Sequence, residues 1–160
     1  METLEFPSLG HDHMACLETS LARARARFDA HGLRLTELRE AVLRILAEDH
    51  KALGAYDIIE RLRARGRVIA PISVYRILDV LLEVGLVHRI ESRSAYVACH
   101  GSHEGDSGPL LFLVCNGCGR VAETSDGGLA EMLAERADKA GFTVQDSVIE
   151  VSGHCRDCLP

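Results

Sequence analysis

The sequence lacks tryptophan and is poor in aromatic residues, which make up 4% of its 160 residues. Because 47% of the residues are nonetheless hydrophobic, we expect a core of aliphatic side chains. No apolar run approaches the ~20 residues that a membrane-spanning helix needs. The first residues are acidic and lack the basic and then apolar pattern of a secretory signal. These absences predict a cytoplasmic protein with no membrane partner.

Basic residues are also scarce, since 24 acidic residues against 18 basic ones give a formal net charge of −6. The deficit is uneven along the chain. Residues 20–99 hold 14 basic and 10 acidic residues, residues 100–160 hold 4 and 10, and residues 1–19 hold no basic and 4 acidic residues. A basic module followed by an acidic one is typical of a DNA-binding domain joined to a separate assembly or sensing domain.

One stretch of the basic module has the pattern of a helix that buries one face and exposes the other. Pro71 suits its first turn, and Gly85 suits the position just past its end. Apolar residues recur between them at helical spacing: Val74, Ile77, Leu78, Leu81 and Leu82. The opposite face presents Ser73, Tyr75, Arg76 and Asp79. Tyrosine and arginine near a helix N-terminus suit a DNA major groove, although an ordinary surface helix would show the same pattern.

The surrounding patterns complete a winged helix, which is a helix-turn-helix with a β-ribbon behind it. Helical spacing predicts earlier helices at residues 16–31, 37–48 and 55–65. Two short apolar runs at residues 86–90 and 95–99 predict a β-hairpin after the helix that begins at Pro71, which we call the reading helix. We therefore expect a winged-helix domain over residues 16–99, preceded by a loose tail at residues 1–15.

The second half of the chain predicts a small α/β domain. Residues 100–109 have the glycine, serine and proline content of a linker. Beyond the linker, residues 110–160 contain patterns for strands at 110–115, 120–124 and 143–151, and for a helix at 129–140. The chain as a whole is therefore expected to be α+β.

Six cysteines in a reducing compartment indicate metal or redox chemistry rather than disulfides. Four of them form two Cys-x-x-Cys pairs: Cys115 with Cys118, and Cys155 with Cys158. Four thiolates suit a tetrahedral structural Zn²⁺ site, whereas a redox-active thiol pair or unpaired buried cysteines are the alternatives. Two pairs rather than one favour zinc, which would contribute on the order of 10 kcal/mol to folding.

A second set of possible metal ligands lies around the expected linker. His88 falls in the first wing strand, Cys99 ends the second, His100 and His103 lie in the linker, and Glu123 belongs to the acidic module. One metal bound by all of them would hold the two modules in one orientation. Imidazole, thiolate and carboxylate together suit Zn²⁺, and the thiolate makes iron less natural. Each residue alone could equally be an ordinary strand or surface residue.

The chain resembles the ferric uptake regulator family over about residues 15–160. The resemblance is carried by the segments at residues 55–58, 73–79 and 85–92, and by both cysteine pairs with the Cys-Gly-Arg-Val sequence at residues 118–121. Within the family, the sequence is most similar to the zinc uptake regulators. The resemblance implies a homodimeric, metal-responsive repressor rather than an enzyme, in which residues 110–160 form the dimerisation domain.

The resemblance also implies a role for individual residues. Tyr56 and Arg76 would approach bases, beside Ser73 and Tyr75 on the reading helix. The four paired cysteines would hold structural zinc. His88, Cys99, a linker histidine and Glu123 would form a regulatory site, giving one structural and one regulatory zinc ion per chain. We expect His103 as the linker ligand, because His100 directly follows Cys99 and would struggle to reach the same ion.

A third metal site is in doubt. Many family members use a histidine shortly before the last cysteine pair, where this chain has Ser147, and the nearest histidine is His154. Near the N-terminus, His11, His13 and Cys16 could bind a metal weakly.

The expected function is zinc-dependent repression of zinc-uptake genes by a dimer bound to a palindromic operator. Zinc at the regulatory site would fix the two DNA-binding modules at a separation that matches successive major grooves. Glu60 and Arg63, outward on the third helix, could join two dimers on one operator. The alternatives are an iron- or peroxide-responsive regulator on the same fold, or a thiol oxidoreductase that uses the cysteine pairs.

Overall fold

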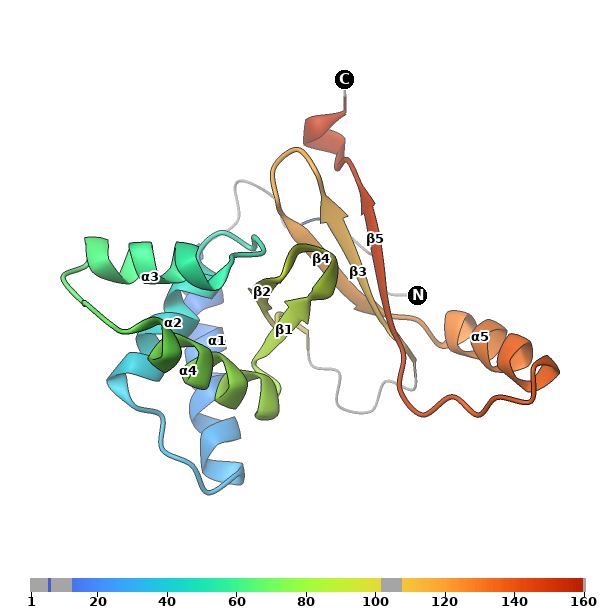
Figure 1. Cartoon of the computed structure of the whole chain (residues 1–160), viewed down its shortest axis with the longest axis horizontal. Coiled ribbons are helices and arrows are strands. Elements are labelled where there is room, and N and C mark those ends of the chain that lie inside the picture. Colours follow the sequence, from blue (N-terminus) through green and yellow to red (C-terminus); the bar gives the residue numbers. More distant parts are fainter. Residues whose placement is uncertain (1–5, 7–12, 102–107, 160) are drawn as a thin grey trace. The chain divides into compact units, whose positions relative to one another are not determined.

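The computed structural model of the protein describes residue 6, residues 13–101 and residues 108–159. The chain divides into two compact units: the first ends at Cys99, and the second consists of the chain from His100 onward together with Phe6. Figure 1 labels their helices and strands. His11 and His103, which were singled out from the sequence, lie outside the described residues. In the part of the chain that is described, no helix is both long enough and apolar enough to cross a membrane.

The described residues of the first unit form four α-helices, whose ends follow from local sequence. They are α1 (His13–Ala30), α2 (Glu37–Ala47), α3 (Ala55–Ala64) and α4 (Pro71–Glu83). The Thr36 hydroxyl accepts a hydrogen bond from the backbone N–H of Arg39 at 3.3 Å and so caps α2. Gly85 ends α4 as expected, because its φ of +69° is a conformation that favours glycine. Helix α1 begins before residue 16, since neither glycine nor proline separates His13 from the expected start.

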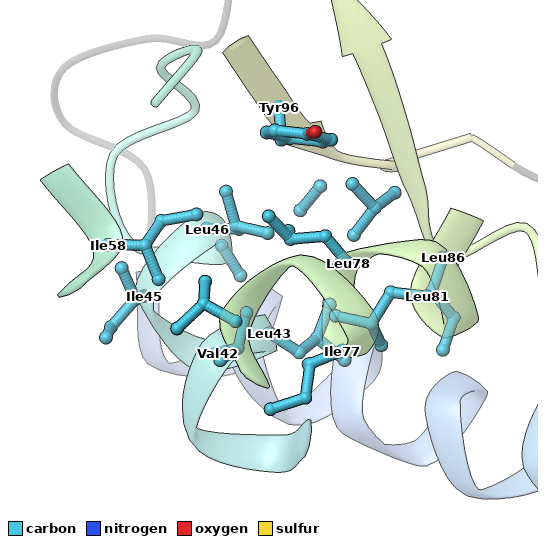
Figure 2. Packing of buried hydrophobic residues seen from close by; sticks show 14 of the residues in the cluster. Val42, Leu43, Ile45, Leu46, Ile58, Ile77, Leu78, Leu81, Leu86 and Tyr96 are labelled. Carbon is cyan, nitrogen blue, oxygen red and sulfur yellow. The ribbon is translucent and has the colours of Figure 1, made fainter. Parts of the chain in front are cut away.

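The core of this unit is aliphatic, as the sequence predicts. Figure 2 shows side chains of α2, such as Val42 and Leu46, facing Leu78 and Leu81 of α4. All four of these side chains are fully buried. This packing fixes the rotation of α4 about its own axis. The face of the helix opposite Leu78 is therefore exposed to solvent.

The wing is a two-stranded antiparallel hairpin behind α4. Strand β1 (Val87–Ile90) pairs with β2 (Ala95–Ala98), and His88 lies opposite Val97. A short 3₁₀ turn, η1 (Glu91–Arg93), joins the strands at the turn expected from the sequence. Leu53 and Tyr96 exchange two backbone hydrogen bonds of 2.8 Å, which anchor the hairpin to the segment before α3. The winged-helix prediction is thus confirmed.

In its described residues, the second unit is a small three-stranded sheet with one α-helix, which confirms the α+β class. Its elements are β3 (Leu110–Cys115), β4 (Val121–Ser125), α5 (Gly127–Lys139) and β5 (Val148–Gly153). The strand order is β4-β3-β5, with β3 antiparallel to β4 and parallel to β5 (Figure 1). A carboxylate oxygen of Asp126 accepts from the backbone N–H of Leu129 at 3.0 Å and caps α5.

The prediction of the last strand at residues 143–151 was wrong at its start. Strand β5 begins only at Val148, which lies opposite Leu110, the first residue of β3. Residues before Val148 therefore have no β3 residue beside them to continue the ladder. The valines of residues 143–151 do not alternate cleanly, and the structure explains this because only part of the segment is a strand.

Candidate metal centres and nucleic-acid interface

The topology of the second unit brings the two cysteine pairs to one end of the sheet. Cys115 is the last residue of β3, and Cys118 follows it in a tight turn towards β4. Cys155 and Cys158 follow β5, whose last residue, Gly153, lies opposite Cys115. Because β3 and β5 run parallel, their carboxyl ends meet, and the 36 residues between the pairs do not keep the pairs apart.

The four sulfurs have the separation that a tetrahedral zinc site requires. All four Sγ atoms lie within 4.8 Å of one another, and those of Cys118 and Cys155 are 3.8 Å apart. Tetrahedral ligands with Zn–S bonds of ~2.3 Å are separated by about 3.8 Å. None of the six cysteines, all of which are described, forms a disulfide. The residues therefore fit a Zn²⁺ ion held by Cys115, Cys118, Cys155 and Cys158.

Two glycines shape the first cysteine turn. Gly119 has a φ of +75°, which favours glycine because other residues are strained there. A Cβ atom on Gly117 would lie 2.8 Å from Cβ and 2.9 Å from Sγ of Cys158. The turn can therefore close over the second cysteine pair only because residue 117 has no side chain.

A buried arginine also contacts the cysteine cluster, and the sequence did not single it out as a site residue. Arg120 is 4% exposed; its Nε donates to Cys118 Sγ at 3.2 Å, and one Nη donates to Cys155 Sγ at 3.3 Å. The same Nη forms an ion pair with the carboxylate of Asp157. The only local signal was a basic residue two positions after a Cys-x-x-Cys pair. That position alone does not show which way the side chain points.

Their hydrogen-bond partners make the four sulfurs electrostatically unequal. The backbone N–H of Cys155 donates to Cys115 Sγ at 3.3 Å and lowers the pKa of the Cys115 thiol to about 5. The hydrogen-bonded sulfur of Cys155 raises the pKa of Cys158 to about 12. Four adjacent thiols cannot all ionise without a compensating cation, because each thiolate disfavours the next. A bound dication would supply that compensation.

A second pair of metal-ligand side chains lies in the wing of the first unit. The ligand atoms of His88 and Cys99 lie within 4.8 Å of each other. His88 is on β1, and the backbone N–H of Cys99 donates to the carbonyl of Leu86 at 2.9 Å, which extends the hairpin. The guanidinium of Arg23 on α1 donates to the carbonyl of Cys99. Hairpin pairing thus brings together an imidazole and a buried thiol from positions 11 residues apart in the sequence.

Glu123 lies in the second unit, on β4 opposite Phe112. Its carboxylate accepts a hydrogen bond from the backbone N–H of His100 at 3.3 Å. The carboxylate is therefore held beside the first residue of the segment that joins the two units.

Of the N-terminal candidates, only Cys16 has a described side chain. Its Sγ lies within 4.8 Å of a ring nitrogen of His50, a buried residue after α2 with a φ of +51°. Burial raises the pKa of the Cys16 thiol. No local sequence pattern links Cys16 with His50, because the two residues belong to different segments of the chain. His154 is exposed between β5 and the last cysteine pair.

The residues expected to read DNA lie on exposed faces of α3 and α4. Tyr56 at the start of α3 is 68% exposed, and Tyr75 on α4 is 39% exposed. Arg76 is also exposed and Ser73 is half-buried. Val74, Ile77 and Leu78 bury the other side of α4 and so turn these polar groups outward. The first two turns of the helix therefore present hydroxyl and guanidinium donors to solvent.

Comparisons with known proteins agree with this architecture. Residues 30–152 match the signature of the Ferric uptake regulator family. The chain is 37% identical to the zinc uptake regulation protein of Escherichia coli (strain K12) over 139 residues, which cover 87% of this chain and 81% of that protein. It is 33% identical to the zinc uptake regulation protein of Mycobacterium tuberculosis (strain ATCC 25618 / H37Rv) over 132 residues, or 81% and 97% of the two chains.

Solved structures give the same result. A zinc uptake regulator complexed with zinc and DNA matches with a TM-score of 0.78 at 35% identity, over 88% of this chain and 93% of that chain. The structure of holo XcZur matches with a TM-score of 0.73, also at 35% identity, over 88% and 96%. The family signature covers most of the chain and these relatives exceed 30% identity, so the resemblance seen in the sequence is confirmed: the chain belongs to the ferric uptake regulator family.

Proposed function

We propose that this protein is a zinc-responsive repressor that binds operator DNA and silences zinc-uptake genes. The proposal rests mainly on one observation. His88 and Cys99 lie side by side in the wing, which follows helix α4, and the polar face of α4 is exposed. The relatives described as zinc uptake regulators support zinc as the signal. Members of this family are transcription regulators and not enzymes, so we reject the alternative of a thiol oxidoreductase. A protein that binds operator DNA must share its compartment, which agrees with the expected cytoplasmic location.

Tyr56, Ser73, Tyr75 and Arg76 form the proposed DNA-reading surface. Arg76 is exposed on α4, whose burial pattern directs it away from the core. A guanidinium in the major groove can donate two hydrogen bonds to guanine, which is typically worth ~1–3 kcal/mol of discrimination between bases. Tyr56 and Tyr75 offer hydroxyls and aromatic faces for phosphates and for thymine methyl groups.

One structural and one regulatory zinc ion per chain complete the proposal. The four paired cysteines hold the structural ion, supported by their sulfur spacing. His88, Cys99, Glu123 and a linker histidine, for which we propose His103, hold the regulatory ion. At this site one zinc ion would be bound by residues of both domains. The winged-helix domain comprises residues 16–99, the linker residues 100–109 and the dimerisation domain residues 110–160.

Such a shared site explains why zinc would strengthen DNA binding without touching DNA. Ligands drawn from both domains restrict the orientations that the winged helix can adopt. If only a fraction of those orientations can bind DNA, the restriction raises the competent fraction and the apparent affinity with it.

A second copy of this chain is the proposed partner in solution. Strand β5 lies at an edge of the sheet and exposes 58% of Val148, while Val151 and Met132 are also exposed. Helix α5 has no buried residue, although its sequence is amphipathic. Apolar side chains on an edge strand and an uncovered helix suit burial against a symmetry mate. The resulting dimer would match a palindromic operator, and exposed Glu60 and Arg63 could join two dimers on one operator.

The proposal is tested by metal-dependent DNA binding. Operator DNA is selected by the zinc-loaded protein from a random library, and fluorescence anisotropy then follows binding while Zn²⁺, Fe²⁺, Mn²⁺ or Ni²⁺ is added. We expect His88→Ala and Cys99→Ser to abolish the zinc response but to leave a folded dimer with its structural zinc. His154→Ala, which removes an exposed histidine, serves as the matched control and should respond as the unaltered protein does.

Three outcomes would contradict the proposal. A normal zinc response in both variants would overturn the regulatory ligand set. A response to Fe²⁺ at lower concentration than to Zn²⁺ would make the protein an iron regulator, for which the Cys99 thiolate is an unfavourable ligand. Loss of DNA binding on peroxide treatment of the manganese- or iron-loaded protein, without any zinc response, would indicate a peroxide sensor.

A further inference from the structure

One guanidinium links the two cysteine pairs of the second unit. Arg120 donates from Nε to Cys118 Sγ of the first pair at 3.2 Å and from Nη to Cys155 Sγ of the second pair at 3.3 Å. The side chain is almost completely buried, and the Asp157 carboxylate forms an ion pair with the same Nη. A planar guanidinium can make these contacts together, because its N–H donors form a rigid fork in which Nε–H and the neighbouring Nη–H lie side by side.

The charge of the cluster explains why a cation is needed at this position. Four thiolates around one Zn²⁺ ion leave a net charge of −2 in a cluster whose Cys115 and Cys155 sulfurs are buried. A buried guanidinium in direct contact with two of the sulfurs offsets part of this excess, because its partner Asp157 is half-exposed and its charge is screened by solvent. Hydrogen bonds from a cation to an anionic acceptor are also roughly twice as strong as neutral ones. Both effects favour the metal-bound cluster over the open one.

The same contacts change the reactivity of the sulfurs. A lone pair that accepts an N–H bond is less available to a competing metal or an electrophile. Asp157 is half-exposed, so solvent screens its ion pair with Arg120, and its main effect is to orient the guanidinium.

We propose that Arg120, oriented by Asp157, is a positioning residue that retains the structural zinc ion by bonding the sulfurs of Cys118 and Cys155. It binds no metal itself and acts only through these two ligands. The inference rests on the structural zinc site proposed above.

The test compares zinc release from variants of the full-length chain. All are made in a Cys99→Ser background, so that the zinc measured belongs to the four-cysteine site. Zinc transfer to excess 4-(2-pyridylazo)resorcinol is followed by absorbance. Because groups that contact metal ligands typically change metal affinity by 10–100-fold, we expect Arg120→Met to release zinc on the order of 10–100 times faster. Arg156→Met removes an equal charge from an exposed position within the second cysteine pair and should release zinc at the unaltered rate.

Cobalt substitution separates a role at sulfur from a role in folding. Loss of N–H···S hydrogen bonds raises the energy of the sulfur lone pairs, so the sulfur-to-cobalt charge-transfer band should move to lower energy in Arg120→Met and stay in place in Arg156→Met. Asp157→Asn keeps the guanidinium but weakens its orientation, and we expect a smaller acceleration in the same direction. This variant keeps the inference testable if Arg120→Met does not fold.

The results distinguish this inference from the proposed zinc site. A chain that contains no zinc in the Cys99→Ser background would refute the structural site itself. If zinc is present but Arg120→Met and Asp157→Asn release it at the unaltered rate, or the cobalt band does not move, the structural site stands and the role of Arg120 is overturned.

Discussion

At Gly117, the addition of a single methyl group should disturb the cysteine cluster. An alanine Cβ there would lie 2.8 Å from Cys158 Cβ, an anchored atom that cannot rotate away. We expect Gly117→Ala to destabilise the zinc-loaded protein by about 1–3 kcal/mol, the usual cost of overpacking a tight site. The midpoint of thermal unfolding at saturating zinc measures the effect.

Gly153→Ala is the matched control, since a Cβ at that residue, at the end of β5, would meet nothing within 4 Å. Equal melting temperatures for the two alanine variants would show that the turn yields without cost, contrary to the contact seen here.

Helix α4 is positioned by its buried face, so its packing can be tested apart from its DNA contacts. Leu78 is fully buried between α2 and the wing (Figure 2), whereas Ile72 on the same helix is 59% exposed. We expect Leu78→Ala to lower the free energy of unfolding by about 2–5 kcal/mol, because it leaves a cavity. Ile72→Ala should change it by less than about 0.5 kcal/mol. Urea denaturation monitored by circular dichroism measures both, and similar losses in the two variants would contradict the assigned burial.

Helix ends were predicted correctly where a capping residue or a glycine marks them in the sequence. Gly85 was predicted to end a helix and ends α4, and the predicted start of α2 at residue 37 directly follows its cap, Thr36. The start of β5 carries no such signal. It is set by where β3 offers a partner, and that partner is distant in the sequence.

The molecule as a whole should respond to zinc removal in two stages. A chelator of moderate affinity should take the regulatory ion first, so that DNA binding is lost while the dimer persists. A stronger chelator, or zinc removal under acid, should take the structural ion and unfold the second unit, since structural zinc contributes on the order of 10 kcal/mol to folding. Sedimentation velocity and zinc analysis at each step measure the result, and dissociation of the dimer before any loss of DNA binding would contradict the order of the stages.

Local amino-acid patterns were enough to predict the types of secondary-structure element and the types of candidate metal ligand. Helical and strand periodicities are local, and so is the Cys-x-x-Cys spacing that places two thiols on one turn. These patterns alone predicted the winged helix, the exposed polar face of α4 and the four cysteines that we propose as zinc ligands.

Which residues from distant parts of the chain come into contact depends on the three-dimensional fold. Parallel pairing of β3 with β5 brings Cys118 within 3.8 Å of Cys155, and hairpin pairing brings His88 beside Cys99. Arg120 turned inward onto the sulfurs, and Cys16 met His50, with no local signal for either. The physical reason is that strand pairing and burial join residues by packing across the fold, whereas periodicity records only the direction of each side chain relative to its own backbone.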